Sequence, residues 1–268
     1  MDKEIDVSVI VVSYNTKNYT LSCVKSVFRS KTKKKIEVIV VDNASCDGTC
    51  QSLQKFGSKL KLIKNNKNLG FAKANNQGIK IAKGKYLFLL NSDAEISDYV
   101  IDRLIDFADF HPNVGVVVPR LLNSDGSVQK SVFKLPTLSG AILEYWFNMK
   151  GNYGQYVPKG KAPVEIESAV MAAFLITPIA RRYAPFLNEK YFMYFEDLDY
   201  CRKIRNFGLS IYYLPYVKVV HHLGKSGYGY NQWRRLVPSS KIYHGALKHY
   251  LIWFVMKTNQ LVKKIYNV

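Results

Sequence analysis

The sequence predicts an α/β fold in which a mostly parallel, Rossmann-like β-sheet is flanked by helices. Apolar, β-branched runs at residues 7–13, 36–41 and 86–90 end abruptly in polar residues, as buried strands do. Stretches with helical periodicity separate these runs, and strands that alternate with helices are typical of a parallel sheet covered on both faces. A chain of 268 residues can also bury a sufficient core without disulfides.

The remaining elements of the first half follow in chain order. Helical periodicity predicts helices at residues 20–29, 49–56, 72–82 and 98–110. Gly84 ends the third of these helices. Two further strands are expected at residues 59–63 and 114–118.

Beyond Pro119 the pattern loosens. Residues 123–126 (Asn-Ser-Asp-Gly) predict a turn flanked by hairpin strands, and an aromatic stretch lies around residues 145–147. Residues 169–177 have the character of a strand or of a buried helix. The last predicted elements of this part are a helix that starts near Glu196 and two short strands around Pro215, at residues 211–214 and 217–220.

The charge is concentrated at the C-terminal end. The chain has 39 basic and 20 acidic residues, a net charge of +19, and residues 201–268 contain twelve Lys or Arg but no Asp or Glu. Such a basic segment implies an anionic partner: nucleic acid, anionic lipid or a phosphorylated substrate. The composition alone does not choose among the three.

An apolar stripe runs along the same basic segment from Ser239 onward. Its members recur at three- and four-residue spacing, which predicts one face of a helix. They are Tyr243, Leu247, Tyr250, Leu251, Phe254, Leu261, Val262 and Ile265. Two interpretations stay open: a helix packed on the catalytic domain or on a second subunit, as in a homodimer, and a membrane-surface helix attracted to anionic lipid.

Cysteine usage and the N-terminus indicate the compartment. Four cysteines in a chain of this size do not make a disulfide framework, so we expect reduced thiols. The first residues are acidic and lack the basic region and cleavage site of a secretory signal. The longest apolar run, residues 169–180, is broken by Pro178 and is too short to span a membrane. We expect a cytoplasmic protein, either soluble or peripheral on the inner face of the cell membrane.

Three strand ends carry unusual polarity. The first strand ends in Ser13-Tyr14-Asn15, the second in Asp42-Asn43, and the strand at residues 86–90 runs into Asn91-Ser92-Asp93. Turn and helix-cap chemistry accounts for one such end more easily than for three, and ligands of open parallel sheets bind at these ends. Asp93 with Asn91 is a candidate site for Mg²⁺, which uses few protein carboxylates together with substrate phosphates.

Two common nucleotide sites are excluded. No G-x-G-x-x-G follows the first strand and no G-x-x-x-x-G-K-[ST] occurs, which argues against a hydride-transfer dinucleotide enzyme and a Walker-type NTPase.

A second carboxylate cluster, Glu196, Asp197 and Asp199, follows an aromatic run and is either a complement to a helix dipole or the source of a general base. His221 and His222 end a strand. Two interpretations of this pair stay open: one of the histidines ligates a metal, or both are packing or surface residues.

In this order, these segments resemble the family-2 glycosyltransferases with the GT-A fold, particularly the bacterial rhamnosyltransferase-like members that build cell-surface polysaccharides. The resemblance covers about residues 7–226. It rests on residues 9–15, 40–45, 66–72, 75–76, 89–93, 172–174, 194–199 and 219–222. Any one of these segments is a weak signal, and the ordered set is specific.

The resemblance implies a role for each of these positions. The nucleotide-sugar donor would be bound by Ser13, Tyr14, Asn15, Asp42, Asn43, Asn68, Gly70, Asn75 and Ser92. Mg²⁺ or Mn²⁺ would be held by Asp93, Asn91 and His221. Asp197 would be the general base of an inverting transfer, and the acceptor would meet Ala172, Ala173 and Glu196.

The family likeness also predicts the reaction. A sugar, with L-rhamnose favoured, would pass from a dTDP- or UDP-sugar to a hydroxyl of a glycan or lipid-linked acceptor. The chain departs from the family where Asn91 replaces the first acid of the metal motif, where Ala172 replaces a common Gly, and where Ala184-Pro185 replaces a Gly-Gly pair. These last two departures fall on the acceptor side.

The resemblance divides the chain into three parts: a nucleotide-sugar-binding half (1–120), an acceptor-binding and catalytic half of the same domain (121–226), and a basic amphipathic extension (227–268).

Two alternative functions remain. A nucleic-acid-binding protein would use the basic end, but no RRM, KH or zinc-finger signature accompanies it, so nucleic acid is not an expected partner. A sugar nucleotidyltransferase would need a Gly-rich basic loop after the first strand, where Ser13-Tyr14-Asn15-Thr16 stands instead.

Overall fold

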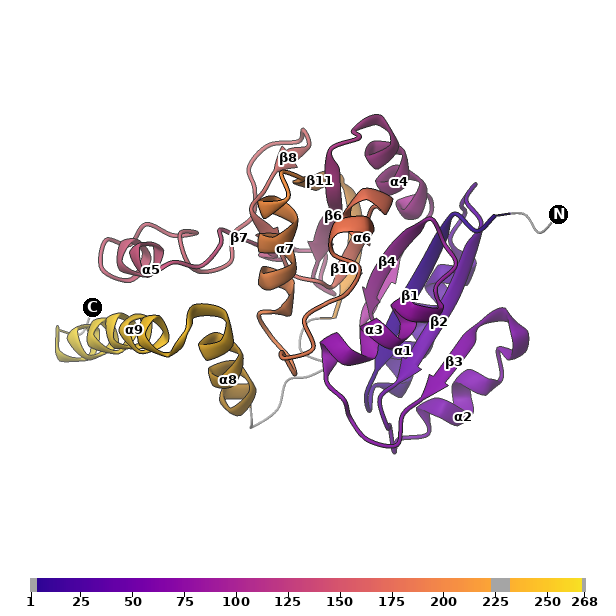
Figure 1. The fold of residues 1–268 in the computed structure, drawn as a ribbon, viewed down its shortest axis with the longest axis horizontal. Helices are drawn as coiled ribbons and strands as arrows, with labels where there is room; N and C mark the ends of the chain where they lie inside the picture. Colours follow the sequence, from indigo (N-terminus) through magenta and orange to yellow (C-terminus); the bar gives the residue numbers. More distant parts are fainter. Residues whose placement is uncertain (1–3, 223–231, 267–268) are drawn as a thin grey trace.

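The computed structural model describes residues 4–222 and 232–266 as a layered α/β fold with a helical extension at one end (Figure 1). The central sheet has the strand order β3-β2-β1-β4-β10-β6-β11-β5, with β8 paired to β11. The strands are β1 (Val7–Ser13), β2 (Ile36–Asp42), β3 (Lys61–Lys64), β4 (Tyr86–Asn91), β5 (Ala94–Ile96), β6 (Val114–Leu122), β8 (Val164–Glu165), β10 (Ala173–Ile176) and β11 (Ser210–His221). A separate pair joins β7 (Val132–Phe133) to β9 (Ser168–Ala169).

Most neighbouring strands at the N-terminal end of this sheet run parallel. β1 pairs in parallel with β2 and β4, and β2 pairs in parallel with β3. β10 lies antiparallel between β4 and β6, and β11 continues in parallel from β6. The predicted α/β fold with a mostly parallel sheet is therefore confirmed, and β10 is the antiparallel strand that joins its two halves.

Helices cover the sheet. They are α1 (Lys17–Arg29), α2 (Thr49–Gln54), α3 (Phe71–Ile81), α4 (Val100–Phe110), α5 (Leu138–Tyr145), α6 (Pro178–Tyr183), α7 (Glu196–Asn206), α8 (Gln232–His244) and α9 (Ala246–Tyr266), with a short 3₁₀ turn at Gly57–Lys59. Each helix predicted in the first half is present within a few residues of its expected bounds. All four cysteines are free.

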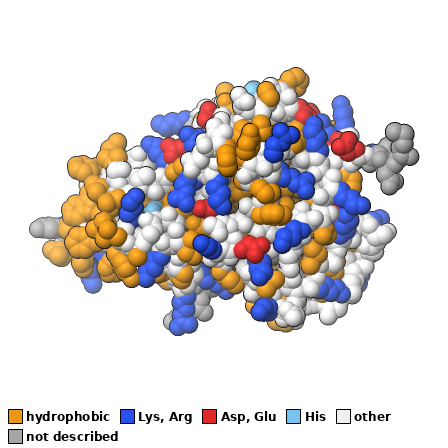
Figure 2. All heavy atoms as spheres, viewed as in Figure 1, with side chains coloured by type: hydrophobic (Ala, Val, Ile, Leu, Met, Phe, Trp, Pro, Cys, Tyr) orange, Lys and Arg blue, Asp and Glu red, His pale blue; other side chains and the backbone are white. Residues whose placement is uncertain are grey.

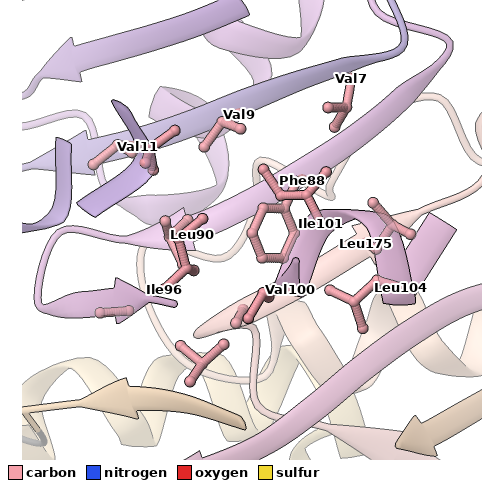
Figure 3. Close-up of a cluster of buried hydrophobic side chains, with 14 of the residues drawn as sticks. Val7, Val9, Val11, Phe88, Leu90, Ile96, Val100, Ile101, Leu104 and Leu175 are labelled. Carbon is pink, nitrogen blue, oxygen red and sulfur yellow. The ribbon is translucent and has the colours of Figure 1, made fainter. Parts of the chain in front are cut away.

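Alternation along β1 divides the core between the two faces of the sheet. Val7, Val9 and Val11 point toward Phe88 of β4 and Leu104 of α4 in one cluster (Figure 3). Ile10 belongs to the cluster on the opposite face. There α3 approaches so closely that a Cβ on Gly78 would lie 2.6 Å from Ile10 Cγ2. This close packing of α3 fixes the segment that precedes it, which carries part of the site described below.

Residues 169–177, expected as a strand or a buried helix, contain the strand β10. The second half differs from the sequence prediction in two other places. The two short strands expected around Pro215 form one strand, β11, whose register with β6 shifts between Leu214 and Lys218. Proline cannot donate to a ladder, so the irregularity accommodates it without ending the strand. The turn at residues 123–126 is present, but after it only Val128 bridges back to Leu122.

The C-terminal extension consists of two helices where the sequence predicted one. Gly245, with φ of +78°, separates α8 from α9. α9 lies beside α5, a helix the sequence did not predict (Figure 1). Among residues 4–222 and 232–266, no helix combines the length and the apolarity needed to cross a membrane. The predicted boundary between residues 226 and 227 lies outside the described residues.

The predicted apolar stripe is present, but it does not face a core. Tyr243 is buried, whereas Leu247, Phe254, Leu261 and Ile265 are each more than half exposed. At the end of the molecule formed by α5 and α9, apolar side chains gather on the surface (Figure 2). The buried positions of α9 are His249, Ile252 and Asn259. α9 therefore packs through a different face from the one that the apolar periodicity indicated.

Candidate active site

The carboxyl ends of β1, β2 and β4 meet at one edge of the sheet, as expected. Ser13 pairs with Asp42, and Val12 pairs with Asn91, so the three polar strand ends are neighbours. They open onto a cavity of about 520 Å³ whose wall includes Tyr14, Asn43, Asn68, Gly70, Asn91, Ser92, His221, Glu196 and Asp197. The structure thus brings nine of the predicted site residues to one cavity.

Asn43 organises the donor side of this cavity. Its Nδ2 donates to Asn68 Oδ1 at 2.8 Å and to the carbonyl oxygen of Gly70 at 3.3 Å. Its Oδ1 accepts from Asn65 Nδ2 and from the backbone N–H of Leu69, each at 3.0 Å. A buried amide with all these partners holds one conformation, so the loop at residues 65–70 is fixed against the end of β2.

Gly70 connects this loop to the second half of the chain. It has a φ of +85°, and a Cβ at this position would lie 2.4 Å from the carbonyl oxygen of Phe192. The next residue, Phe71, donates its N–H to the same oxygen at 2.7 Å. Only glycine permits this approach, and the approach ties the donor loop to the aromatic run before Asp197.

The loops after β1 and β2 are also fixed to each other. Asn15 Oδ1 accepts from the N–H of Cys46 at 2.8 Å, and Ser45 Oγ accepts from the N–H of Asn15 at 2.9 Å. Asp42 Oδ2 accepts from the N–H of Ser45 at 3.0 Å. The other oxygen of Asp42, Oδ1, is buried without a hydrogen-bond partner among the described residues.

Four predicted donor residues are not part of the cavity wall: Asn15 and Asp42, which fix the loops described above, and Ser13 and Asn75. Ser13 is buried beneath α1, where its Oγ lies 2.8 Å from Thr20 Oγ1. Asn75 is buried within α3 and donates to the carbonyl oxygen of Phe71 at 3.0 Å. Both side chains support the elements that carry the wall instead of forming it.

The metal candidates converge from two strands. His221 Nε2 at the end of β11 lies 3.3 Å from Asp93 Oδ1 and 3.5 Å from Asn91 Nδ2. Gln129, which the sequence did not single out, fixes this ring: its Nε2 donates to the backbone oxygen of His221, and its Oε1 lies 2.9 Å from His221 Nδ1. Because Oε1 can only accept, Nδ1 carries a proton, and Nε2 faces Asp93.

These residues fit a divalent ion that is shared with a diphosphate. A carboxylate oxygen suits both Mg²⁺ and Mn²⁺, which complete their coordination with phosphate oxygens and water, and the imidazole nitrogen beside it favours Mn²⁺ of the two. Within the part of the chain that the structure describes, no group of three or more His, Cys, Asp or Glu could hold a metal. The ion would therefore depend on the donor for part of its shell. Lys225, which the sequence offers with His221 as an alternative neutraliser of the diphosphate if no metal is used, lies outside the described residues.

Asp197 and Glu196 begin α7 at the opposite side of the cavity. The backbone enters the helix through Tyr194 and Phe195, both with φ near +70° (71° and 68°). Residues other than glycine rarely adopt this left-handed backbone conformation, and such strain concentrates at functional sites. The strained turn directs the two carboxylates toward the cavity at the helix N-terminus.

Burial sets the protonation of this carboxylate pair. Desolvation raises the pKa of Asp197 to about 6, although backbone N–H groups, including that of Leu198 at 2.8 Å, partly offset the shift. Desolvation, with repulsion from Asp197 as the second cause, raises the pKa of Glu196 well above its ordinary value. At neutral pH Asp197 is therefore mostly ionised, and burial favours the protonated form of Glu196. The arrangement supplies a base with a pKa close to the working range.

The neighbouring acid and histidine have structural roles. Asp199 is buried, forms salt bridges with Arg202 at 2.9 Å and Lys203 at 3.1 Å, and does not line the cavity. His222 Nε2 lies 2.9 Å from Glu95 Oε1, and this contact joins β11 to β5. Asp197 and His221 are thus the members of the two clusters that face the cavity with Glu196.

The acceptor side differs in detail from the expectation. Ala172 and Ala173 are buried in the sheet, where the carbonyl oxygen of Ala172 accepts from the N–H of Asn91 at 2.8 Å. The cavity wall is formed by their neighbours Val170 and Met171. The close pairing of this segment with β4 buries both alanines and keeps them out of the wall.

The sequence prediction missed two groups of residues. Asn76 fixes the segment before the aromatic run through Leu187. Its Oδ1 accepts from the N–H of Leu187, and its Nδ2 donates to the carbonyl oxygen of Leu187, both at 2.9 Å. The adjacent amides Asn75-Asn76 were a signal that could have found it. The second group lies on α8 and α9 and includes Trp233, Arg235, Ile252, Trp253 and Met256 of the cavity wall. No local motif marks these residues.

Comparison with known proteins agrees with this geometry. Residues 8–176 match the model of the family described as glycosyl transferase family 2. Over 212 residues the chain is 26% identical to an N-acetylglucosaminyl-diphospho-decaprenol L-rhamnosyltransferase of Mycobacterium tuberculosis, an alignment that covers 73% of this chain and 69% of that protein.

Two solved structures share the fold. One is S. aureus TarS 1–349, with a TM-score of 0.61 and 18% identity, covering 94% of this chain and 69% of the other. The other is GalNAc-T7 with UDP, GalNAc and Mn²⁺, with a TM-score of 0.64 and 16% identity, covering 91% of this chain and 47% of the other. At these identities the likeness concerns the arrangement of the sheet and helices alone.

Proposed function

This chain belongs to glycosyl transferase family 2 and is a glycosyltransferase, and from that premise we propose that it moves L-rhamnose from a dTDP- or UDP-sugar to a hydroxyl of a lipid-linked saccharide with inversion. The observation that carries the proposal is the single cavity that joins the polar strand ends to Asp197. A donor held at one end and a base at the other is the arrangement that a direct displacement needs.

The donor binds at the strand ends. Tyr14, Asn43 and Asn68 lie on the wall where a nucleotide would be held, and Asn15 and Asp42 fix the loops around it. Asp93 and His221, with Asn91 beside them, would hold Mg²⁺ or Mn²⁺ against the diphosphate. When bound, the ion neutralises the charge that develops on the leaving diphosphate. GalNAc-T7, a structural neighbour, contains Mn²⁺.

Asp197 would accept the proton of the acceptor hydroxyl. Ionised at neutral pH because its pKa is about 6, it strengthens the hydroxyl oxygen as a nucleophile while the anomeric carbon–diphosphate bond breaks. Burial raises the pKa of the neighbouring Glu196 and so favours its protonated form, which would donate a hydrogen bond to an acceptor oxygen. With the base and the diphosphate on opposite sides of the sugar, the displacement inverts the anomeric carbon.

The acceptor and the location follow from the relative and from the basic end. The M. tuberculosis relative is named for an acceptor whose sugar is attached through a diphosphate to decaprenol. We propose an acceptor of that class, and hence action at the inner face of the cell membrane. The exposed apolar residues of α9, such as Leu261 and Ile265, and the exposed Lys263 and Lys264 support peripheral contact with anionic lipid.

A donor panel tests the proposed function. The purified chain is heated with each of a set of UDP- and dTDP-sugars plus Mn²⁺, and the same sugars are offered with an N-acetylglucosaminyl-diphosphate lipid in a transfer assay. We expect dTDP-rhamnose to raise the melting temperature and to be consumed, and excess chelator to reduce both effects. Protection and transfer with a different sugar would correct the donor, and transfer to no diphosphate-linked acceptor would refute the proposed function.

Sedimentation with vesicles tests the location. The full chain is expected to bind vesicles with anionic lipid and not neutral ones, and Leu261→Ser with Ile265→Ser is expected to weaken this binding. A stable dimer in solution that the same double variant dissociates would instead support the homodimer through α9 that the sequence left open.

A further inference from the structure

The cavity continues beyond Asp197 into the C-terminal extension. From the catalytic carboxylates its wall passes to Leu236 on α8 and then to Ile252, Trp253 and Met256 on α9. The character of the wall changes along this path, since the donor end is lined by amides and hydroxyls and the far end by apolar and aromatic side chains. The ligand that fits both ends is amphipathic.

Three faces of α9 have separate surroundings. Val255 and Asn259 face α5, where the carbonyl of Val255 accepts from Trp146 Nε1 at 3.3 Å and Asn259 donates to the carbonyl of Tyr145. The exposed apolar stripe with Phe254 and Leu261 lies on another face. The third face, spaced at three and four residues, lines the cavity: His249, Ile252, Trp253, Met256, Lys257 and Gln260.

The extension is anchored to the catalytic loop. Ser239 Oγ donates to the carbonyl of Met193 at 2.8 Å, and the guanidinium of Arg202 on α7 lies 4.1 Å from the centre of the Tyr243 ring. These contacts place α8 next to the strained turn that presents Asp197. The apolar wall is therefore held at a fixed position relative to the base.

Two cations line the cavity, Arg235 of α8 and Lys257 of α9. Residues 201–268, which include both helices, contain no Asp or Glu. A cationic wall next to an apolar one complements a diphosphate that joins a sugar to a hydrocarbon chain.

We propose that the cavity face of α9, together with Leu236, binds the hydrocarbon chain of the acceptor next to its diphosphate, so that the C-terminal extension is an acceptor-binding element. This inference rests on the proposed lipid-linked acceptor. It separates the cavity face of α9, which would recognise one lipid molecule, from the outer stripe, which would contact a lipid surface.

The test compares two acceptors with the same sugar diphosphate, one on a long polyprenyl chain and one on a short water-soluble alkyl chain. Assays run in detergent micelles, so that binding to a bilayer does not contribute. The cavity variant is Trp253→Ala with Met256→Ala. The matched control on the outer face of the same helix is Phe254→Ala with Leu261→Ala.

The cavity variant is expected to raise KM for the long-chain acceptor about tenfold, the loss expected when one or two methylenes lose their contacts, and to leave the short-chain acceptor nearly unchanged. The control variant is expected to change neither value. Equal losses with both acceptors, no loss with either, or a long-chain defect confined to the control would overturn the inference. A wild-type enzyme that transfers to neither acceptor would refute the proposed function itself. That result is distinct from a failure of this inference, in which the wild type is active and only the pattern among the variants differs.

Discussion

The two ends of the cavity are built in different ways. At the donor end, most of the residues come from the first half of the chain, where Asn43, Asn68 and Gly70 share hydrogen bonds between the end of β2 and the loop at residues 65–70. At the acceptor end, the wall is assembled from segments of the second half that lie far apart in the chain, among them Met171, Asp197 and Trp253. The donor end is therefore built mainly from neighbouring parallel strands and their loops, and the acceptor end from helices and loops that only the tertiary fold brings together.

Both ends also contain unsatisfied buried polarity. The donor-end amides are paired with neighbouring groups, but Oδ1 of Asp42 is buried without a hydrogen-bond partner among the described residues. At the acceptor end, Glu196 is buried with its Oε2 lacking a hydrogen-bond partner among the described residues. Unsatisfied buried groups raise the energy of the folded state and are retained where they serve a ligand. We therefore expect changes at the acceptor end to affect turnover, and changes at the donor end to affect donor binding.

The largest expected effect is on turnover at the acceptor end. Asp197→Asn should lower kcat by about 10²–10⁴-fold, because it removes a general base, and should leave donor affinity nearly unchanged. In the wild type, kcat should rise with pH through about 6, since Asp197 acts only when ionised. Stopped transfer assays from pH 5 to 8 and calorimetric titration with donor measure the two effects. Glu165→Gln, a surface carboxylate on β8, is the control; near-normal turnover of Asp197→Asn would remove the assignment.

The donor end should respond in the opposite way. Asp93→Ala should weaken donor binding by at least the roughly 10–100-fold typical of residues that support a metal site. It should also abolish the dependence of donor binding on Mg²⁺ or Mn²⁺. Among the described residues, Asp93 is the carboxylate that lies next to His221 Nε2, at 3.3 Å. Titration of donor with and without chelator gives the result. Full activity of the wild type in excess chelator would contradict a role for the ion.

A smaller effect is expected at the residue that orients His221. Gln129→Ala removes the acceptor of the Nδ1 proton, which lies 2.9 Å away. Metal affinity should fall by about 10–100-fold, and saturating Mn²⁺ should restore most of the activity. Gln129→Glu keeps an acceptor at this position and should retain more affinity than the alanine variant. An alanine variant with unchanged metal affinity would show that Gln129 only fills space.

The donor end was predicted from sequence better than the acceptor end for a physical reason. Parallel strands end at one edge of a sheet, so the residues after β1, β2 and β4 are neighbours in any fold of this class, and a strand pattern is enough to bring Asn43 and Asn91 together. Even there, Ser13 and Asn75 turned inward, because which side of a turn a side chain faces depends on its hydrogen-bond partners.

The acceptor end depended on packing that no periodicity specifies. The spacing of apolar residues on α9 identified a real stripe, but that stripe is exposed, and the buried face carries His249 and Asn259, which hydropathy does not mark. The sequence showed α5, the helix against which α9 packs, only as an aromatic stretch. The position of Asp197 was recognised from its motif, whereas its strained backbone and raised pKa follow from burial that only the three-dimensional structure shows.

The smallest expected effect concerns stability and tests the unsatisfied polarity of the acceptor end. Burial raises the pKa of Glu196 above its ordinary value of 4.5, so the folded protein holds this proton at pH values where the unfolded chain has released it. Below the ordinary pKa both states are protonated and the side chain contributes no pH dependence. As pH rises above it, only the unfolded state gains from ionisation, and the wild type loses stability.

Glu196→Gln cannot ionise and should escape this loss. The free energy of unfolding of the variant should match that of the wild type near pH 4 and exceed it increasingly as pH rises, by at most about 1.4 kcal/mol per pH unit until the folded-state pKa is reached. Urea denaturation at pH 4, 6 and 8 measures the difference. Asp199→Asn, which loses the salt bridges to Arg202 and Lys203 at the same helix end, is the control and should be less stable than the wild type at pH 8. If Glu196→Gln is instead less stable than the wild type at pH 8, Glu196 is ionised and paired in the folded protein.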